Sequence, residues 1–385
     1  MDAPRTIYLD NNATTRVDDA VLEAMLPLLR EAYGNAGSGH HLGRAVARDV
    51  NAARRRVADH FGIKPAGVVF CSGATEADNL ALRGALAARP GRRHLITTAV
   101  EHPAVLDCAR ALEREGRCEL TVLGVDAQGR LDLDALEGAL RPDETALVSV
   151  MGANNETGVL FPLEAIAERA RAAGAWVHVD AVQLVGKSTV DLATLPADLI
   201  ALSAHKFHGP KGVGVLVARP GVALEPLVHG GGQEKGRRPG TLNTAGIVGL
   251  AVALDRAAEV RDEAVPRMTA LRDRLESGLR EAVPELEITG AGAERVANTT
   301  HFTVPGVEAE ALLVRLDREG VCCSSGSACS TGALEPSHVL TAMGVAPERV
   351  HGALRLSTSR ETTEDDVECA LEVLPEAVRR LRALA

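Results

Sequence analysis

Several features that mark whole classes of protein are scarce in this sequence of 385 residues. Aromatic residues make up only 2% of it, and no basic run is interleaved with aromatic residues, so a nucleic-acid-binding surface is not expected. No apolar run approaches the ~20 residues that a membrane helix needs, and the first residues do not resemble a signal peptide. The net charge is −10. We therefore expect a soluble, cytoplasmic protein that binds neither nucleic acid nor a membrane.

Lysine and cysteine are also few, which narrows the chemistry that either residue can perform. Lysine occurs only at positions 64, 187, 206, 211 and 235. The cysteines stand at positions 71, 108, 118, 322, 323, 329 and 369, and their odd number fits free thiols better than a disulfide framework. No Cys-x-x-Cys pair or well-spaced histidine accompanies them, so we expect no intrinsic metal site.

Short runs rich in Val, Ile and Leu recur between residues 65 and 220 and are typical of buried strands. The runs are 68–71, 95–100, 120–125, 146–151, 176–182, 199–204 and 213–218. Most are separated by amphipathic stretches of helical length, as the crossovers of a parallel sheet require. Residues 205–212 are too few for a crossover, so the last strand should run antiparallel to the one before it. We predict an α/β fold with a mixed, mostly parallel seven-stranded sheet.

The pattern changes near residue 240 to a long helical stretch, 245–282, which we expect to connect two domains. Pro266 lies inside this stretch and should kink it or split it in two. A smaller C-terminal α/β region follows, with strands expected near 297–304 and 355–357. The predicted parts are an N-terminal segment at 1–15 that packs with the small domain, a large domain at 16–255 and the small domain at 256–385.

Two sequence features at the ends of predicted strands are suited to a ligand. The stretch Cys71–Glu76 follows a strand and opens a helix, where backbone N–H groups and the Thr75 hydroxyl favour an anion such as phosphate. An ordinary helix start capped by Thr75 is the alternative. Asp180 ends another strand, where a carboxylate can keep a pyridinium nitrogen protonated, although a capping or surface Asp gives the same signal.

Lys206 is the first candidate for lysine chemistry because it directly follows an apolar strand. Burial and neighbouring groups at such a position can lower the pKa of an amine and make it a nucleophile, as a Schiff-base lysine requires. Lys211 is a rival, but it lies between Pro and Gly in an expected exposed turn. Lys187 is a weaker candidate, and we expect the other lysines to be solvated.

Cys329 is the first candidate for thiol chemistry. It lies in a run of small residues, 323–332, without apolar periodicity, which indicates an exposed loop where a cysteine can become a thiolate nucleophile. The cysteines interpreted instead as small core residues are Cys71, Cys108, Cys118 and Cys369.

A histidine and an arginine complete the candidates. His102 follows a predicted strand, where an imidazole can stack on a planar cofactor and exchange protons, with a structural histidine as the alternative. Arg355 can bind a carboxylate through two N–H groups, although a lone arginine in a strand often belongs to a surface ion pair.

Taken together, these residues resemble the cysteine desulfurases, a class-V aminotransferase-like family of fold-type I pyridoxal-phosphate (PLP) enzymes, and most closely the nitrogen-fixation (NifS) type. The likeness covers essentially the whole chain. It is carried, in order, by Tyr8–Thr15, Ser72–Asn79, Val100–Val105, Asn154–Gly158, Asp180–Gln183, Ser203–Lys206, Gly240–Thr241, Ser324–Cys329 and Glu335–His338.

The resemblance implies a role for each candidate residue. The PLP phosphate is expected to bind Ala74, Thr75, Ser203, His205 and, from the other subunit of a homodimer, Thr241. The remaining implied contacts are Asp180 with the pyridine nitrogen, Gln183 with the ring hydroxyl, His102 stacked on the ring, Asn155 with cofactor and substrate, and Arg355 with the substrate carboxylate. Lys206 would hold PLP covalently.

The implied reaction converts L-cysteine to L-alanine and leaves the sulfur on Cys329 as a persulfide. The sulfur would pass to an acceptor or scaffold protein for iron–sulfur cluster assembly, with nitrogenase as the expected destination. Cys329 would contact iron only transiently, through its persulfide.

Some positions depart from the family pattern, and rival functions remain open. Ala36 and Gly37 stand where the family more often has Pro-Ser. Cys322 and Cys323 form an unusual pair that either ends a strand or relays the persulfide. A selenocysteine lyase or another fold-type I enzyme would not depend on Cys329, and a non-catalytic sulfur-carrier scaffold would bind no chromophore.

Overall fold

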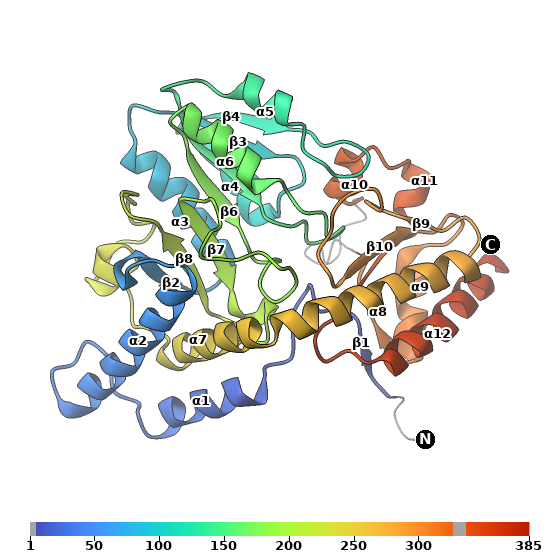
Figure 1. Ribbon diagram of the computed structural model, residues 1–385, viewed down its shortest axis with the longest axis horizontal. Helices are drawn as coiled ribbons and strands as arrows, with labels where there is room; N and C mark the ends of the chain where they lie inside the picture. Colours follow the sequence, from blue (N-terminus) through green and yellow to red (C-terminus); the bar gives the residue numbers. More distant parts are fainter. Residues whose placement is uncertain (1–4, 326–335, 385) are drawn as a thin grey trace.

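A mixed seven-stranded sheet forms the centre of the larger part of the computed structural model, which describes residues 5–325 and 336–384 (Figure 1). In order across the sheet, the strands are β2 (Val68–Cys71), β8 (Gly214–Ala218), β7 (Leu199–Ser203), β6 (Trp176–Asp180), β5 (Thr145–Met151), β3 (His94–Thr98) and β4 (Glu119–Leu123). Strand β8 is antiparallel to β2 and β7, and the other neighbours run parallel. The predicted sheet and its reversed last strand are confirmed.

Helices pack on both faces of this sheet and at its sides (Figure 1). The helices of the described residues are α1 (Asp19–Arg30), α2 (His41–His60), α3 (Ala74–Ala88), α4 (Pro103–Arg114), α5 (Leu133–Ala139), α6 (Leu163–Ala172), α7 (Thr244–Glu259), α8 (Arg261–Ala282), α9 (Ala309–Arg318), α10 (His338–Ala342), α11 (Pro347–Val350) and α12 (Glu364–Arg382). Short 3-10 turns occur at η1 (Pro65–Gly67), η2 (Ala204–Lys206) and η3 (Gln233–Gly236).

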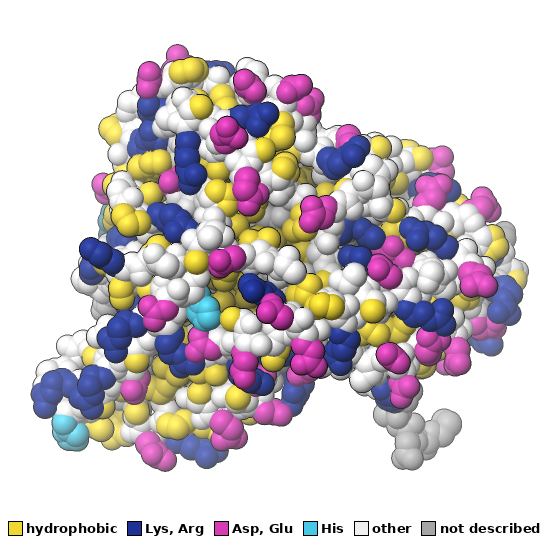
Figure 2. Space-filling view, in the orientation of Figure 1, with side chains coloured by type: hydrophobic (Ala, Val, Ile, Leu, Met, Phe, Trp, Pro, Cys, Tyr) yellow, Lys and Arg dark blue, Asp and Glu magenta, His cyan; other side chains and the backbone are white. Residues whose placement is uncertain are grey.

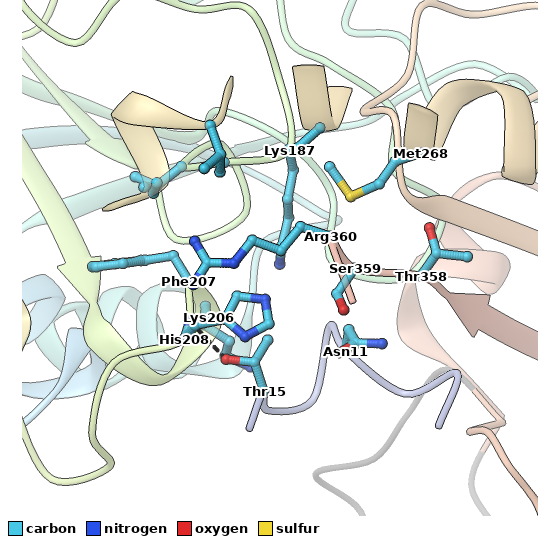
Figure 3. A pocket seen from close by; sticks show the side chains of 15 residues that line it. Asn11, Thr15, Lys187, Lys206, Phe207, His208, Met268, Thr358, Ser359 and Arg360 are labelled. Atoms are coloured by element: carbon cyan, nitrogen blue, oxygen red, sulfur yellow. Dashed lines mark hydrogen bonds between the residues drawn. The ribbon is translucent and has the colours of Figure 1, made fainter. Parts of the chain in front are cut away.

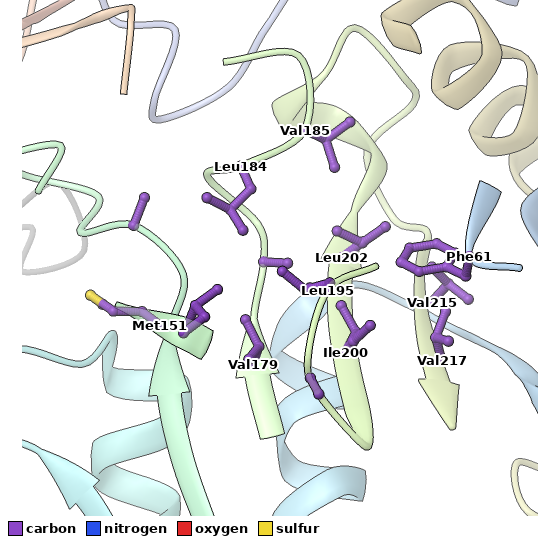
Figure 4. Packing of buried hydrophobic residues seen from close by; sticks show 14 of the residues in the cluster. Phe61, Met151, Val179, Leu184, Val185, Leu195, Ile200, Leu202, Val215 and Val217 are labelled. Carbon is purple, nitrogen blue, oxygen red and sulfur yellow. The ribbon is translucent and has the colours of Figure 1, made fainter. Parts of the chain in front are cut away.

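The strands of the sheet are apolar throughout because both of their faces are covered. Along β2, Val68 and Phe70 belong to one hydrophobic cluster, and Val69 and Cys71 to another on the opposite face. Figure 4 shows part of the first cluster, where side chains of β6, β7 and β8 pack together with Phe61. The uninterrupted apolar runs in the sequence therefore correspond to two-sided burial.

The long helical stretch is divided at Val260, and not at Pro266 as the sequence suggested. Pro266 lies inside α8, close to its beginning, where the missing N–H removes one intrahelical hydrogen bond without ending the helix. Helix α7 packs against α1 and α2, whereas α8 packs against α12. The break thus falls where the packing partners change, and the two helices together run from the larger part to the smaller part of the molecule (Figure 1).

The smaller part is built on a three-stranded antiparallel sheet, whose strands in order are β12 (Ala353–Ser357), β10 (Thr299–Thr303) and β9 (Glu287–Ile288). The N-terminal strand β1 (Ile7–Tyr8) pairs in parallel with β11 (Val321–Cys322). Ile7 and Leu9 are buried in the same hydrophobic cluster as residues of α8, α9 and α12. This cluster is the second hydrophobic core of the protein, and the N-terminal segment is part of it.

Acidic and basic side chains are interspersed over the face of the molecule drawn in Figure 2, without a large field of one sign. None of the helices within the described ranges is both long and apolar enough to cross a membrane.

Candidate active site

A cleft of about 810 Å³ lies at the carboxyl ends of β5, β6 and β7, and both parts of the molecule and the N-terminal segment contribute to its walls. The predicted site residues that line it are Ala74, Thr75, His102, Asn155, Asp180, Gln183, Ser203, His205, Lys206 and Arg355. They come from separate stretches of the sequence, and most follow strands of the larger sheet whose carboxyl ends share one edge, whereas Arg355 comes from β12.

The beginning of α3 forms one end of the cleft. Gly73 is at the N-cap, and no side chain within the described part of the protein caps the helix, so Thr75 lies in the first turn and does not act as the cap. A β-carbon on Gly214 would lie 2.6 Å from the Gly73 carbonyl carbon, so β8 directly supports this turn. The first backbone N–H groups and the helix dipole favour an anion at this position.

Asp180 lies at the end of β6 on the floor of the cleft, with 7% of its surface exposed. Its Oδ1 accepts a hydrogen bond of 3.0 Å from the Val182 N–H. Burial raises the pKa of the Asp180 carboxyl to about 6, against the opposing effects of this hydrogen bond and of the charge on Lys206. A cationic group bound here would favour the ionised carboxylate.

Lys206 lies in η2, immediately after β7, and its side chain reaches the N-terminal segment. Its Nζ donates hydrogen bonds of 2.7 Å to the carbonyl of Asn12 and 2.9 Å to that of Ala13. Both acceptors are backbone carbonyls. These two hydrogen bonds therefore fix the position of the amine in the cleft without involving a carboxylate. The segment Tyr8–Thr15 therefore supplies part of the site.

Two histidines in the cleft are uncharged near neutral pH. Burial, reinforced by the charge on Lys206, lowers the pKa of His102 to about 4 and that of His205 to about 4. The His102 Nδ1 accepts the Ala104 N–H at 3.1 Å at the start of α4, so the neutral ring carries its proton on Nε2. The His205 ring lies 3.1 Å from the Thr14 hydroxyl.

Arg355, on β12, is the contribution of the smaller part of the molecule. Its side chain is 2% exposed, and it donates hydrogen bonds to the Asp10 carboxylate at 2.7 Å and to the Asn155 carbonyl at 2.9 Å. The sequence-based alternative of a surface ion pair is therefore wrong, since this guanidinium is buried beside the cleft.

Buried carboxyl groups around the cleft were not predicted from the sequence. Asp78, Glu101 and Glu156 are each at most 2% exposed. Burial raises the pKa of Glu101 to about 8, raises that of Glu156, and together with the charges of Asp180 and Glu101 raises that of Asp78 well above its usual range. A signal for Asp78 exists, because it stands among Ala77, Leu80 and Ala81 on the apolar face of α3.

One predicted site residue lies away from this cleft, and the position of another is not described. Thr241 is exposed and lines a separate cavity near α2 and η3, so it does not reach the cleft of its own subunit. Cys329 lies outside the described residues. Of the other cysteines, Cys71, Cys108 and Cys118 are buried, as predicted, whereas Cys369 is only partly buried against the second core.

Cys322 and Cys323, which are adjacent in the sequence, are thiols and not thiolates. Burial raises the pKa of Cys323 to about 12, and burial also raises the pKa of Cys322. Cys322 belongs to β11, in agreement with the interpretation that the pair ends a strand.

The other lysines differ in their exposure. Lys211 is exposed at the rim of the cleft, and Lys64 and Lys235 are exposed as predicted. Lys187, by contrast, is 4% exposed, and its Nζ donates hydrogen bonds to Gln183 Oε1 and, at 3.3 Å, to Asn12 Oδ1.

The sequence and the fold are both similar to those of known proteins. Residues 7–369 match the family model described as aminotransferase class-V. The chain is 50% identical to "Cysteine desulfurase 2" of Trichormus variabilis, over 98% of this chain and 94% of that protein. It is 45% identical to "Cysteine desulfurase NifS" of Azotobacter vinelandii, over 98% and 93%. A solved structure of a NifS-like protein has a TM-score of 0.91 at 39% identity, covering 97% of this chain and 100% of that one.

Proposed function

Because the chain belongs to the aminotransferase class-V family, and its relatives include proteins named cysteine desulfurase, we propose that it is a PLP-dependent cysteine desulfurase. It would convert free L-cysteine to L-alanine and retain the sulfur. The observation that carries the proposal is the placement of Lys206, Asp180 and the beginning of α3 around one cleft. An amine, a buried carboxylate and an anion site are the three features that PLP requires.

The cleft fits PLP in both size and chemistry. Its volume of about 810 Å³ is within the range of cofactor sites, and the beginning of α3 lies at one end of it. The phosphate would be held there by Ala74 and Thr75, with Ser203 and His205 beside them. Asp180 would face the pyridine nitrogen, Gln183 the ring hydroxyl, and His102 the face of the ring. Bound PLP supplies an electron sink for a carbanion next to the amino group of a substrate.

The substrate would be oriented by its carboxylate. Arg355 donates a hydrogen bond to the backbone carbonyl of Asn155, and both residues line the cleft, so together they would bind one carboxylate. Asp10 accepts a hydrogen bond from the same guanidinium and thereby helps to fix its orientation.

The sulfur transfer would take place between L-cysteine and Cys329. The Cys329 thiolate attacks the substrate sulfur, an S–S bond forms, and the bond between that sulfur and the substrate β-carbon breaks. The electron pair stays with the β-carbon, which takes up a proton and becomes the methyl group of alanine. His102, neutral and protonated on Nε2, is the group placed to exchange protons in the cleft.

A homodimer would complete the site. Thr241 lies in the segment 226–243, which is largely exposed and carries the exposed apolar side chains of Leu227 and Val228. This segment is anchored to its own subunit by the buried Glu234, which pairs with Arg54 and accepts the Phe70 N–H. An anchored, partly apolar segment suits a subunit interface, from which Thr241 would reach the phosphate of the other subunit.

Mass spectrometry tests the proposal directly. After incubation of the PLP-loaded protein with L-cysteine, the peptide that contains Cys329 should gain one sulfur atom, and alanine should form. The Cys329→Ala variant should bind PLP normally but form neither product, and Lys206→Ala should no longer be trapped on PLP by borohydride. Undiminished alanine and sulfide from Cys329→Ala would overturn the persulfide step. We further propose that an acceptor for iron–sulfur cluster assembly, and for nitrogenase in particular, receives the sulfur.

A further inference from the structure

Lys187 is an ionisable side chain in an unusual place. It lies seven residues after the end of β6, is 4% exposed, and forms no ion pair with any carboxylate of the described residues. Burial lowers the pKa of its amine well below 10.5, and the charges of Lys206 and Arg355 lower it further. A buried amine without a counter-ion destabilises the fold. The presence of Lys187 at this position therefore needs an explanation, and its two hydrogen bonds are the place to look for one.

Both of these bonds are to amide oxygens. Lys187 donates to Gln183 Oε1 and to Asn12 Oδ1, and the two N–H groups of an uncharged amine match these two acceptors. An amide whose oxygen faces Lys187 must direct its NH₂ group away from it. Gln183 accordingly donates from Nε2 to the Asn12 carbonyl at 3.2 Å.

Asn12 connects this arrangement with the rest of the site. Its carbonyl accepts from both Gln183 and Lys206, while its side-chain oxygen accepts from Lys187 and, at 3.0 Å, from Asn298. Its Nδ2 donates to the Asn155 carbonyl at 3.1 Å and to the Thr299 hydroxyl at 2.8 Å. The oxygens of Asn12 accept hydrogen bonds and its NH₂ group donates them, so its side-chain amide cannot turn over without losing these bonds. Asn12 therefore holds Lys187 and Gln183 in a single orientation.

Lys187 lines a small second cavity. The cavity has a volume of about 30 Å³, enough for one or two water molecules, and Figure 3 shows that Lys187 and Lys206 both line it. Its walls include the apolar side chains of Phe207 and Met268. The two lysines therefore lie close together but have different partners, backbone carbonyls for Lys206 and amide side chains for Lys187.

We infer that Lys187 is a positioning residue that keeps Gln183 turned so that an amide N–H, and not the amide oxygen, faces the ring hydroxyl of bound PLP. This inference rests on the proposed function, because it concerns the cofactor proposed above. An N–H donor stabilises the deprotonated ring oxygen relative to the protonated one. Loss of the donor therefore makes the ring oxygen harder to deprotonate.

A double-mutant cycle with a spectroscopic readout tests the inference. The measured quantity is the pH at which the visible absorption band of the bound cofactor is half converted, for the wild type, Lys187→Met, Gln183→Ala and the double variant. Lys187→Met is expected to raise this pH by about one unit, Gln183→Ala by a similar amount, and the double variant by no more than either. The exposed Lys64→Met serves as control and should not shift it.

Two results would overturn the inference. One is a Lys187→Met protein that titrates as the wild type does, and the other is a double variant whose shift equals the sum of the single shifts, as a through-space effect of charge would give. Should Lys187→Met not fold, Lys187→Gln retains a donor and is expected to titrate within about 0.3 unit of the wild type. A shift in Lys187→Gln as large as that in Gln183→Ala would contradict the role. If the wild type forms no visible band with PLP, the proposed function fails instead.

Discussion

The guanidinium of Arg355 lies 2.7 Å from the carboxylate of Asp10 and joins the N-terminal segment to strand β12. Arg355 is almost completely buried, whereas the Asp10 side chain is 20% exposed. The pair thus holds a buried cation at the wall of the cleft and links two segments that are far apart in the sequence.

Removal of the carboxylate should destabilise the protein. In Asp10→Asn the buried Arg355 loses its charged partner, and we expect the free energy of unfolding of the apoprotein to fall by about 1–3 kcal/mol. Denaturant titration measures the change. The matched control is Asp19→Asn, which breaks an exposed pair with Arg16 and should cost less than about 0.5 kcal/mol. Equal effects of the two substitutions would show that the Asp10 pair contributes nothing special.

Gly214→Ala should disturb the anion site although Gly214 itself does not line the cleft. The new β-carbon would lie 2.6 Å from the Gly73 and Leu202 backbones, so the turn before α3 must move. We expect a loss of about 1–3 kcal/mol in stability and weaker PLP binding, measured by equilibrium dialysis. Gly138→Ala, in α5 with open space around it, is the control and should be neutral or slightly stabilising. Unchanged PLP affinity in Gly214→Ala would contradict the close contact.

Glu101 should make stability depend on pH. Burial raises its pKa from 4.5 to about 8, so the native state keeps a proton that the unfolded state releases above 4.5. The stabilisation from this group is therefore complete below 4.5 and is lost as the pH rises through about 8. Glu101→Gln keeps an oxygen for the Thr98 and Met151 bonds and cannot ionise.

The variant should accordingly be more stable than the wild type above pH 8, by an amount on the order of 2–4 kcal/mol. Denaturation of the apoprotein across the pH range measures the difference. Glu113→Gln, at an exposed position of α4, should leave the profile unchanged. A Glu101→Gln profile parallel to that of the wild type would show that Glu101 is already ionised in the folded protein.

The proposed dimer predicts a link between assembly and cofactor affinity. The double variant Leu227→Asp/Val228→Asp places charge on the exposed segment that carries Thr241 and should shift the protein to monomers in analytical ultracentrifugation. PLP should then bind about tenfold more weakly, because the contribution of Thr241 from the other subunit is lost. Val314→Asp, at a 56% exposed apolar position on α9, should change neither property. Dissociation without a loss of affinity would argue against a shared site.

Much of the fold could be predicted because its central strands carry an unmistakable pattern. Residues such as Val148 and Val150 are buried with their neighbours on both faces, so the strands read as continuous apolar runs, and the short connection before β8 gave its direction. The break at Val260 could not be predicted. A proline shows where one hydrogen bond is missing, whereas this helix ends where its packing partners change.

For the site, the position of a residue relative to the predicted strands was a useful guide to candidates, whereas the burial of a charged residue was hard to predict. Lys206 and Asp180 could be chosen because strand ends converge in a parallel sheet. The sequence ranked Lys187 low, since whether a charged residue is buried depends on what the rest of the chain packs against it. For Asp78 the apolar neighbours on α3 were a usable sign of burial, but they indicate no role. Thr241 is a further case, because its implied place depends on a second subunit.

The interactions of the N-terminal segment also set the order in which the protein can be assembled. Residues 7–15 are made long before several of their hydrogen-bond partners, which include Asn298, Thr299 and, 345 positions after Asn12, Ser357. At about 5–20 residues per second, a ribosome needs roughly 20–70 seconds to add that many residues. The larger sheet has time to form in this interval, whereas the segment that holds Lys206 still lacks its partners on β10 and β12. We therefore expect the wall of the cleft that this segment forms to be completed only after most of the chain has left the ribosome.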